Sequence, residues 1–122
     1  MKASLLAAAL IVLAACGSSS STTAASCMSF TDLTATTAIV AFGGANGNAY
    51  VPRCAMVTVN QEITFNGDFS GHPLSQTSGA AVIPSTSAGT SVTFSIPAAG
   101  TYDYQCDFHH AGGMTGAIKV VP

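Results

Sequence analysis

Short segments in which apolar and polar residues alternate make up most of this chain, and Gly, Pro, Asn and Ser separate them. No segment after residue 26 shows helical periodicity. A period of two is typical of a half-buried β-strand, because successive side chains in a strand point to opposite faces. Tyr102, Tyr104 and Cys106, for example, fall on one face of such a segment. The chain is therefore expected to fold as β-structure.

Six segments show this pattern most clearly: residues 39–42, 54–59, 62–66, 91–96, 101–106 and 117–121. Six to eight short strands with no helix between them predict an all-β antiparallel sandwich or barrel. Because only Asn60 and Gln61 separate the second and third segments, we expect those two strands to be neighbours. Residues 79–90 are too rich in Ser, Ala, Gly and Thr to assign.

The chain has 122 residues, which is enough for one domain with one core. It carries only three Lys or Arg residues and five Asp or Glu residues, with a formal net charge of −2. So few cations cannot neutralise a run of phosphates, and this excludes nucleic-acid binding as a main role. Asp32, Arg53, Asp103 and Lys119 are expected to be solvated surface residues.

The N-terminal segment has the features expected of an export signal. Lys2 precedes an apolar run at residues 5–15, which is too short to span a membrane. The run ends in Leu-Ala-Ala-Cys16 and resembles the bacterial lipoprotein signal, in which the cysteine is lipidated and becomes the new N-terminus. We therefore expect a signal peptide at 1–15, lipidated Cys16 with a flexible Ser/Thr/Ala tether at 16–26, and one folded domain at 27–122.

This reading predicts an exported protein, attached by its lipid to a bacterial membrane and facing the periplasm or the cell exterior. An ordinary secretory signal is the alternative, with Cys16 either removed or left free. The four cysteines divide by their surroundings: Cys16 belongs to the lipid signal and Cys106 opens a loop rich in His and Gly. Exported proteins tend to oxidise spare thiols, so Cys27 and Cys54 are predicted to form a disulfide. Two free buried cysteines are the alternative.

Candidate metal ligands gather in and near the loop that follows residue 106. Cys106 is followed after two residues by His109 and after four more by Met114, and His72 supplies a second imidazole upstream. The intervening Gly112 and Gly113 permit a tight turn. A thiolate, two imidazoles and a weakly bound thioether are the ligands of a blue-copper electron-transfer site.

These motifs resemble the cupredoxin family, in particular its plastocyanin and pseudoazurin branch. The resemblance runs from Tyr50 to Val121, over YVPRC-x2-V-x4-EITFNGDFSGHPL and IPAAGTYDYQC-x2-H-x4-M-x-G-x-I-x-V. It implies a Greek-key β-sandwich with one type 1 copper ion near one end, and the ligands that it implies are His72, Cys106, His109 and Met114. It also implies His109, not His110, as the C-terminal histidine ligand, with one ring edge exposed in an apolar patch.

We therefore predict a monomeric, non-enzymatic electron carrier that exchanges single electrons with redox proteins not yet identified. A copper carrier or buffer without electron transfer is the main alternative. Zinc is a second, with Asp68, Asp107 or His110 as the additional ligand that zinc would prefer to methionine. A nucleophilic Cys–His pair is a third, although no oxyanion hole or substrate cleft is evident from the sequence.

Overall fold

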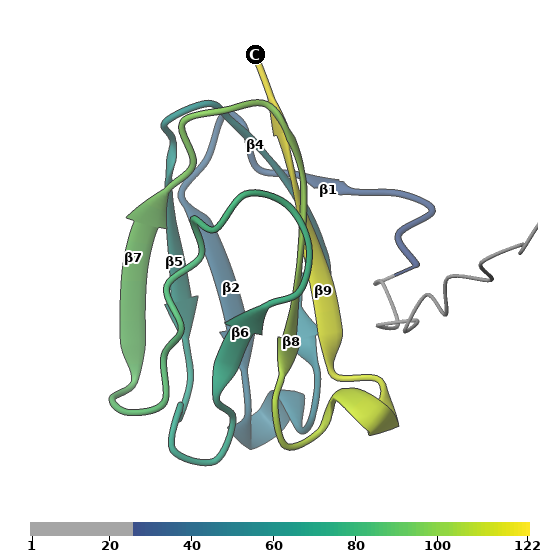
Figure 1. Ribbon diagram of the computed structural model, residues 1–122, viewed down its shortest axis with the longest axis vertical. Coiled ribbons are helices and arrows are strands. Elements are labelled where there is room, and N and C mark those ends of the chain that lie inside the picture. The colour runs from purple at the N-terminus through teal and green to yellow at the C-terminus, as the bar shows by residue number, and fades with distance from the viewer. Residues whose placement is uncertain (1–25) are drawn as a thin grey trace, which may run out of the picture.

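Two β-sheets pack face to face in the part of the chain that the structure, a computed structural model, describes: residues 26–122 (Figure 1). The predicted signal peptide, Cys16 and the tether up to residue 25 lie outside the described residues. No helix between residues 26 and 122 is long and apolar enough to cross a membrane. The strands are β1 (Thr31–Asp32), β2 (Ala38–Phe42), β3 (Tyr50–Val51), β4 (Cys54–Thr58), β5 (Glu62–Asn66), β6 (Leu74–Gln76), β7 (Ser91–Ser95), β8 (Gly100–Cys106) and β9 (Thr115–Val121).

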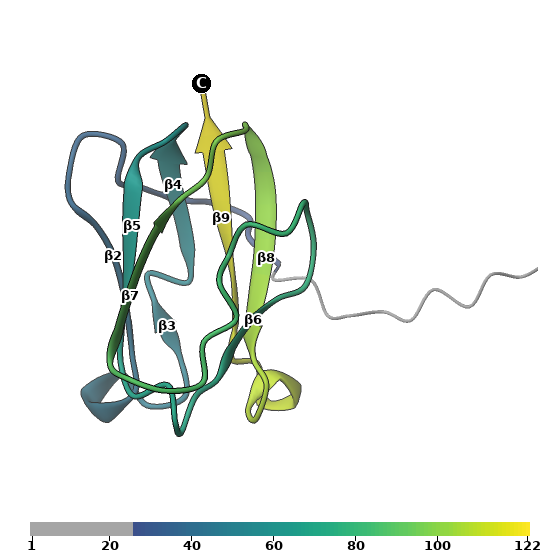
Figure 2. The same ribbon diagram turned by 60° about the vertical axis from the view of Figure 1, so that its left-hand side comes forward.

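One sheet has the strand order β1-β4-β9-β8-β6 and the other has the order β3-β2-β5-β7. Figure 2 shows the two sheets as separate layers, with two short 3-10 turns at the same end. These turns are η1 (Gly44–Asn46) and η2 (His110–Gly112), and the C-terminus lies at the opposite end. The predicted all-β Greek-key sandwich is confirmed. The described residues hold nine strands where six to eight were expected, and two of the nine are only two residues long.

The predicted antiparallel pairing is found between β2 and β3, β5 and β7, β6 and β8, and β8 and β9. It is wrong for three pairs, because β1 pairs with β4, β2 with β5 and β4 with β9 in parallel. The expectation that residues 54–59 and 62–66 form neighbouring strands is also wrong. Asn60, which adopts a positive φ of 64°, and Gln61 carry the chain from one sheet to the other. The connection between β4 and β5 lies at the end of the sandwich opposite η1 and η2 (Figure 1). There the Asn60 N–H donates a hydrogen bond to the carbonyl of Ile96.

The core follows from the alternation seen in the sequence. Inward-facing side chains of both sheets are buried and touch across the sandwich, as alternating strands require. In β5 their outward-facing neighbours are exposed or half-buried, for example Glu62 beside Ile63, whereas in β9 residues of both faces are buried from Thr115 to Ile118. The largest fully buried side chains are Tyr104, Phe65, Phe69, Ile63, Leu74, Ile96, Met114, Ile118, Val40, Val57 and Cys106. Cys106 and Met114 therefore belong to the core as well as to the candidate site.

The predicted disulfide between Cys27 and Cys54 is present, with the two Cα atoms 5.9 Å apart. It attaches the first described residues to the start of β4. The cross-link spans 27 residues, for which the chain-entropy model gives a stabilisation of about 3 to 4 kcal/mol. Cys106 is the free cysteine among the described residues, and it is buried.

Two tyrosines pack edge to face at the centre of the sandwich, but their hydroxyls differ. The ring centroids of Tyr50 and Tyr104 are 4.8 Å apart, and burial raises the pKa of both phenols. The Tyr104 hydroxyl donates a hydrogen bond of 3.2 Å to the carbonyl of Arg53. The Tyr50 hydroxyl is buried and has no hydrogen-bond partner among residues 26–122.

We expect opposite effects on stability when each hydroxyl is removed. Tyr104→Phe should lower the free energy of unfolding by about 1 kcal/mol, the net value of a typical hydrogen bond. Tyr50→Phe should raise it by about 1 kcal/mol, because an unsatisfied polar group leaves the core. Denaturant unfolding measures both changes. A loss of stability in Tyr50→Phe equal to that in Tyr104→Phe would show that the Tyr50 hydroxyl has a partner.

Candidate metal centre

Strand pairing places the candidate ligands at the end of the sandwich that carries η1 and η2. β6 pairs with β8 in antiparallel register, and Leu74 lies opposite Cys106. His72 stands two residues before Leu74, so this register brings it beside the loop that follows Cys106. The Asp107 N–H donates 2.9 Å to the carbonyl of Pro73 and fastens the two segments together.

The loop from Cys106 to Met114 closes on itself through backbone hydrogen bonds. The His109 N–H donates to the carbonyl of Cys106, the Met114 N–H donates to the carbonyl of His109, and the Cys106 N–H donates to the carbonyl of Met114. η2 lies within this loop and is capped by the following Gly113, whose φ of 98° is a left-handed conformation that favours glycine. The two ends of the loop are therefore held at a fixed separation.

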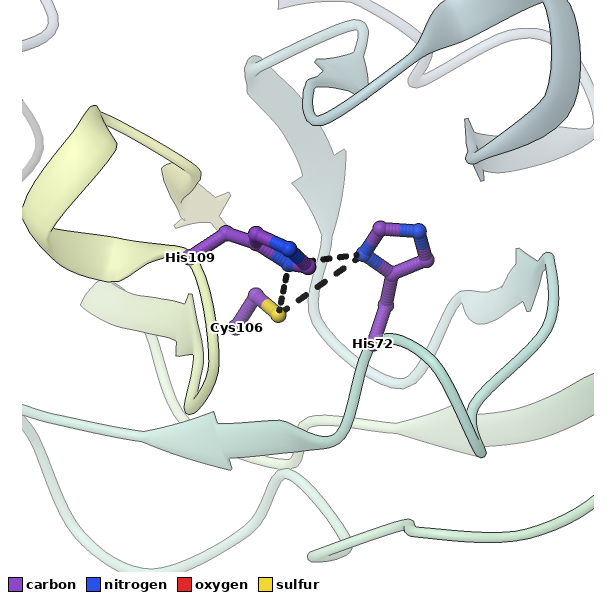
Figure 3. A group of neighbouring side chains, drawn as sticks. All are labelled: His72, Cys106 and His109. Atoms are coloured by element: carbon purple, nitrogen blue, oxygen red, sulfur yellow. Dashed lines mark hydrogen bonds between the residues drawn. The ribbon is translucent and has the colours of Figure 1, made fainter.

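Three donor atoms converge at this end of the molecule (Figure 3). The Cys106 Sγ lies 3.4 Å from the His109 Nδ1 and 3.8 Å from the His72 Nδ1. The two Nδ1 atoms are 3.2 Å apart. Cys106 is fully buried, whereas both histidines are partly exposed.

The spacing of these donors fits a small metal ion bound between them. Metal bonds of about 2.0 Å to imidazole and 2.3 Å to thiolate would separate the donors of a trigonal centre by roughly 3.5–3.7 Å. The observed separations of 3.2–3.8 Å lie around that value. Two imidazoles and one thiolate are the in-plane donors of a type 1 copper site, and the cluster fits such a site.

Met114 lies at the end of the same loop. Its side chain is buried, and it belongs to the apolar cluster that contains Cys106 and Phe69. A thioether is a weak, long axial ligand in blue-copper sites. The structure thus places all four residues expected as ligands at one end of the sandwich, and three of them bring their donor atoms together.

The residues considered as alternative ligands lie outside this cluster. His110 is exposed, and its Nδ1 lies 3.1 Å from the carbonyl oxygen of Asp107 and 3.3 Å from that of Cys106. The Asp107 carboxylate accepts a hydrogen bond from Ser75. The Asp68 carboxylate accepts hydrogen bonds from the hydroxyl and N–H of Ser70, and these lower its pKa.

Two residues that line His72 escaped the sequence reasoning. The ring of Phe42 meets the His72 ring edge to face, with the centroids 5.9 Å apart. A Cβ added to Gly43 would lie 3.5 Å from the His72 ring. Phe42 is the last residue of β2, and Gly43 follows it directly before η1. The sequence pattern predicted a strand over 39–42 and gave neither residue a role in the site.

Arg53, expected as a solvated surface residue, is instead engaged with β9. It is exposed, but its Nε donates 3.0 Å to the carbonyl of Thr115 and its Nη2 donates 2.9 Å to the Thr115 Oγ1. Thr115 directly follows Met114. No pattern in the sequence indicated this contact, which joins residues 62 positions apart.

The comparisons with known proteins agree with the fold and the site. Residues 46–121 match the copper-binding proteins of the plastocyanin/azurin family. The match covers more than half of the chain and includes all four residues expected as ligands. This chain belongs to that family, whose members bind one copper ion.

Solved structures of copper proteins share the fold. A pseudoazurin from Sinorhizobium meliloti is 24% identical, with a TM-score of 0.59 over 75% of this chain and 76% of that one. A reduced auracyanin from Roseiflexus castenholzii is 23% identical, with a TM-score of 0.53 over 73% of this chain and 99% of that one. An oxidised plastocyanin from Dryopteris crassirhizoma is 20% identical, with a TM-score of 0.55 over 69% and 100%. No curated protein matches this sequence.

Proposed function

We propose that the protein is a type 1 copper protein that carries single electrons between redox partners, and that His72, Cys106, His109 and Met114 hold the copper. The observation that carries this proposal is the convergence of two imidazole nitrogens and one buried thiol sulfur within 3.8 Å of one another. A copper ion held there would accept one electron as Cu(II) and release it as Cu(I).

The donor set suits both oxidation states. Thiolate and thioether favour Cu(I), and imidazole suits Cu(I) and Cu(II). The backbone hydrogen bonds within the Cys106–Met114 loop oppose large movements of the ligands when the charge of the metal changes. A site that rearranges little between its two states exchanges electrons with a low barrier, because little reorganisation accompanies each transfer.

The exposure of residues in and beside η2 supports the proposal that electron partners dock at this end of the molecule. His109 is partly exposed at this end, and the neighbouring Phe108 is 66% exposed. Ala111, Gly112 and Gly113 are exposed too and carry no charge. We propose that partners approach the copper over this apolar surface, through the edge of His109. The partners are redox proteins not yet identified, and the carrier acts as a monomer.

The main rival is a copper carrier or buffer that releases its metal. Exposed soft ligands would favour release, because they could transfer copper to another protein. Methionine is such a ligand, since its thioether binds Cu(I). Met28 is fully exposed, Met56 is half-buried and Met114 is buried. They lie in the N-terminal part of the described residues, in β4 and directly before β9, and do not form a methionine cluster. This distribution favours a resident copper ion.

The proposed role is not enzymatic. A copper-containing nitrite reductase from Thermus scotoductus shares the fold, with 21% identity and a TM-score of 0.52, but this chain corresponds to only 22% of that protein. The described residues hold one cluster of metal-ligating His, Cys, Asp or Glu side chains. One such centre suits transfer of single electrons.

We also propose that the protein is exported and attached to a bacterial membrane by lipid on Cys16, facing the periplasm or the cell exterior. The support is the Leu-Ala-Ala-Cys16 sequence, which directly precedes a polar segment. A disulfide between Cys27 and Cys54 is consistent with an oxidising compartment outside the cytoplasm. The tether would keep the copper domain near the membrane.

The copper-loaded protein should show one reversible one-electron couple at positive potential and should keep its copper on reduction. Voltammetry measures the couple, and a modest Cu(I) chelator added after ascorbate measures retention. His109→Ala should abolish the intense thiolate-to-copper absorption or change it strongly. His110→Ala is the matched control at the adjacent position and should retain it. Rapid loss of copper to the chelator would establish the buffer function instead.

Mass spectrometry of the protein extracted from membranes should find a chain that begins at Cys16 with a lipid-sized increment on that residue. Several acyl chains on one residue give stable anchoring where a single chain is marginal. Cys16→Ser should abolish membrane attachment without changing the copper spectrum. An unmodified soluble chain that begins after Cys16 would contradict the anchor.

A further inference from the structure

Both the backbone and the side chain of Arg53 contact the strand that leaves the metal loop. The Arg53 carbonyl accepts hydrogen bonds from the Ala117 N–H at 3.0 Å and from the Tyr104 hydroxyl at 3.2 Å. Its guanidinium donates to the carbonyl and to the hydroxyl of Thr115, at 3.0 and 2.9 Å. Arg53 therefore holds β9 at its first and third residues.

Thr115, which the Arg53 side chain holds, directly follows Met114, the expected thioether ligand. The Met114 backbone is fixed on the inner side by hydrogen bonds to His109 and Cys106. The Thr115 side chain is 3% exposed and accepts its bond from Arg53 in a nearly water-free position. The peptide that joins Met114 to Thr115 is thus held between the metal loop and the guanidinium.

Close packing at Gly116 limits movement of the same segment. A Cβ added at Gly116 would lie 2.3 Å from the ring of Tyr104 and 2.6 Å from the carbonyl oxygen of Arg53. Only glycine fits between these two groups. Both acceptors of the guanidinium are neutral, so the contact with Thr115 fixes geometry without neutralising a carboxylate.

We propose that Arg53 is a positioning residue for Met114. By holding Thr115 it keeps the end of the metal loop in place, and it thereby sets how strongly the thioether engages copper and what reduction potential results. This inference rests on the proposed copper site. It assigns a role to a residue that contributes no donor atom to the cluster.

A double-mutant cycle tests whether Arg53 acts through Met114. Arg53→Lys preserves the positive charge, but a lysine ammonium cannot reproduce the two-point donation of a guanidinium. In the otherwise unchanged protein this substitution should shift the reduction potential upward, because a looser thioether stabilises Cu(II) less. In a Met114→Leu background, where the thioether is absent, the same substitution should leave the potential unchanged.

Two outcomes of the cycle would overturn the proposal. An equal shift in both backgrounds would show that Arg53 affects the copper without involving Met114. A lower melting temperature with no shift in either background would show a purely structural role. Thr115→Val, which removes only the hydroxyl acceptor, should give a smaller upward shift than Arg53→Lys, and a downward shift would count against the proposal.

Amide hydrogen exchange on the copper-free protein separates this inference from the proposed function. The Cys106 amide, which donates to Met114, should exchange several-fold faster in Arg53→Lys than in the unsubstituted protein. The Val59 amide, which donates to Val121 at the far end of the sandwich, should be unchanged. Unchanged exchange at Cys106 would overturn the positioning role even where the protein proves to be a blue-copper carrier. If the copper couple were absent but the Cys106 amide exchanged faster in Arg53→Lys, the copper function would be refuted. The claim that Arg53 holds the Cys106–Met114 loop in place would stand.

Discussion

The pairing of β8 with strands on both of its sides is the constraint on which the site depends. β6 on one side sets Leu74 opposite Cys106, which fixes where His72 stands. β9 on the other side sets Thr115 opposite Gln105, which fixes where the loop that carries His109 returns to the sheet. A slip of one residue in either pairing would turn the side chains of that strand to the other face of the sheet. Donors that are far apart in the sequence therefore meet because of backbone register.

Burial and exposure are distributed across the site in a way that suits electron exchange. The thiol sulfur of Cys106 is fully buried, whereas His109 reaches the surface beside the exposed ring of Phe108. A buried sulfur is protected from oxidation and exchange, since reactive thiols are accessible ones. In the proposed role, a partner would need contact only with the outer edge of His109, and the Cys106 sulfur would stay buried during the transfer.

Much of this arrangement could be predicted from the sequence. Alternation identified the faces of the strands, since Tyr102, Tyr104 and Cys106 are all buried, and the Cys-x2-His-x4-Met spacing identified the loop. The sheet to which each strand belongs could not be predicted, because β4 and β5 alternate alike and only tertiary packing separates them. The contact of Arg53 with Thr115 was equally hidden, since it joins residues 62 positions apart without an opposite charge to suggest it.

The structure of the copper-loaded protein in both oxidation states, determined before and after reduction of the same crystals, tests the central claim most directly. The account predicts copper bound by His72, Cys106, His109 and Met114 in both states. It also predicts that the three close donors keep nearly the separations of 3.2–3.8 Å seen here. Dissociation of either histidine on reduction, or entry of His110 or a carboxylate as a ligand, would contradict it.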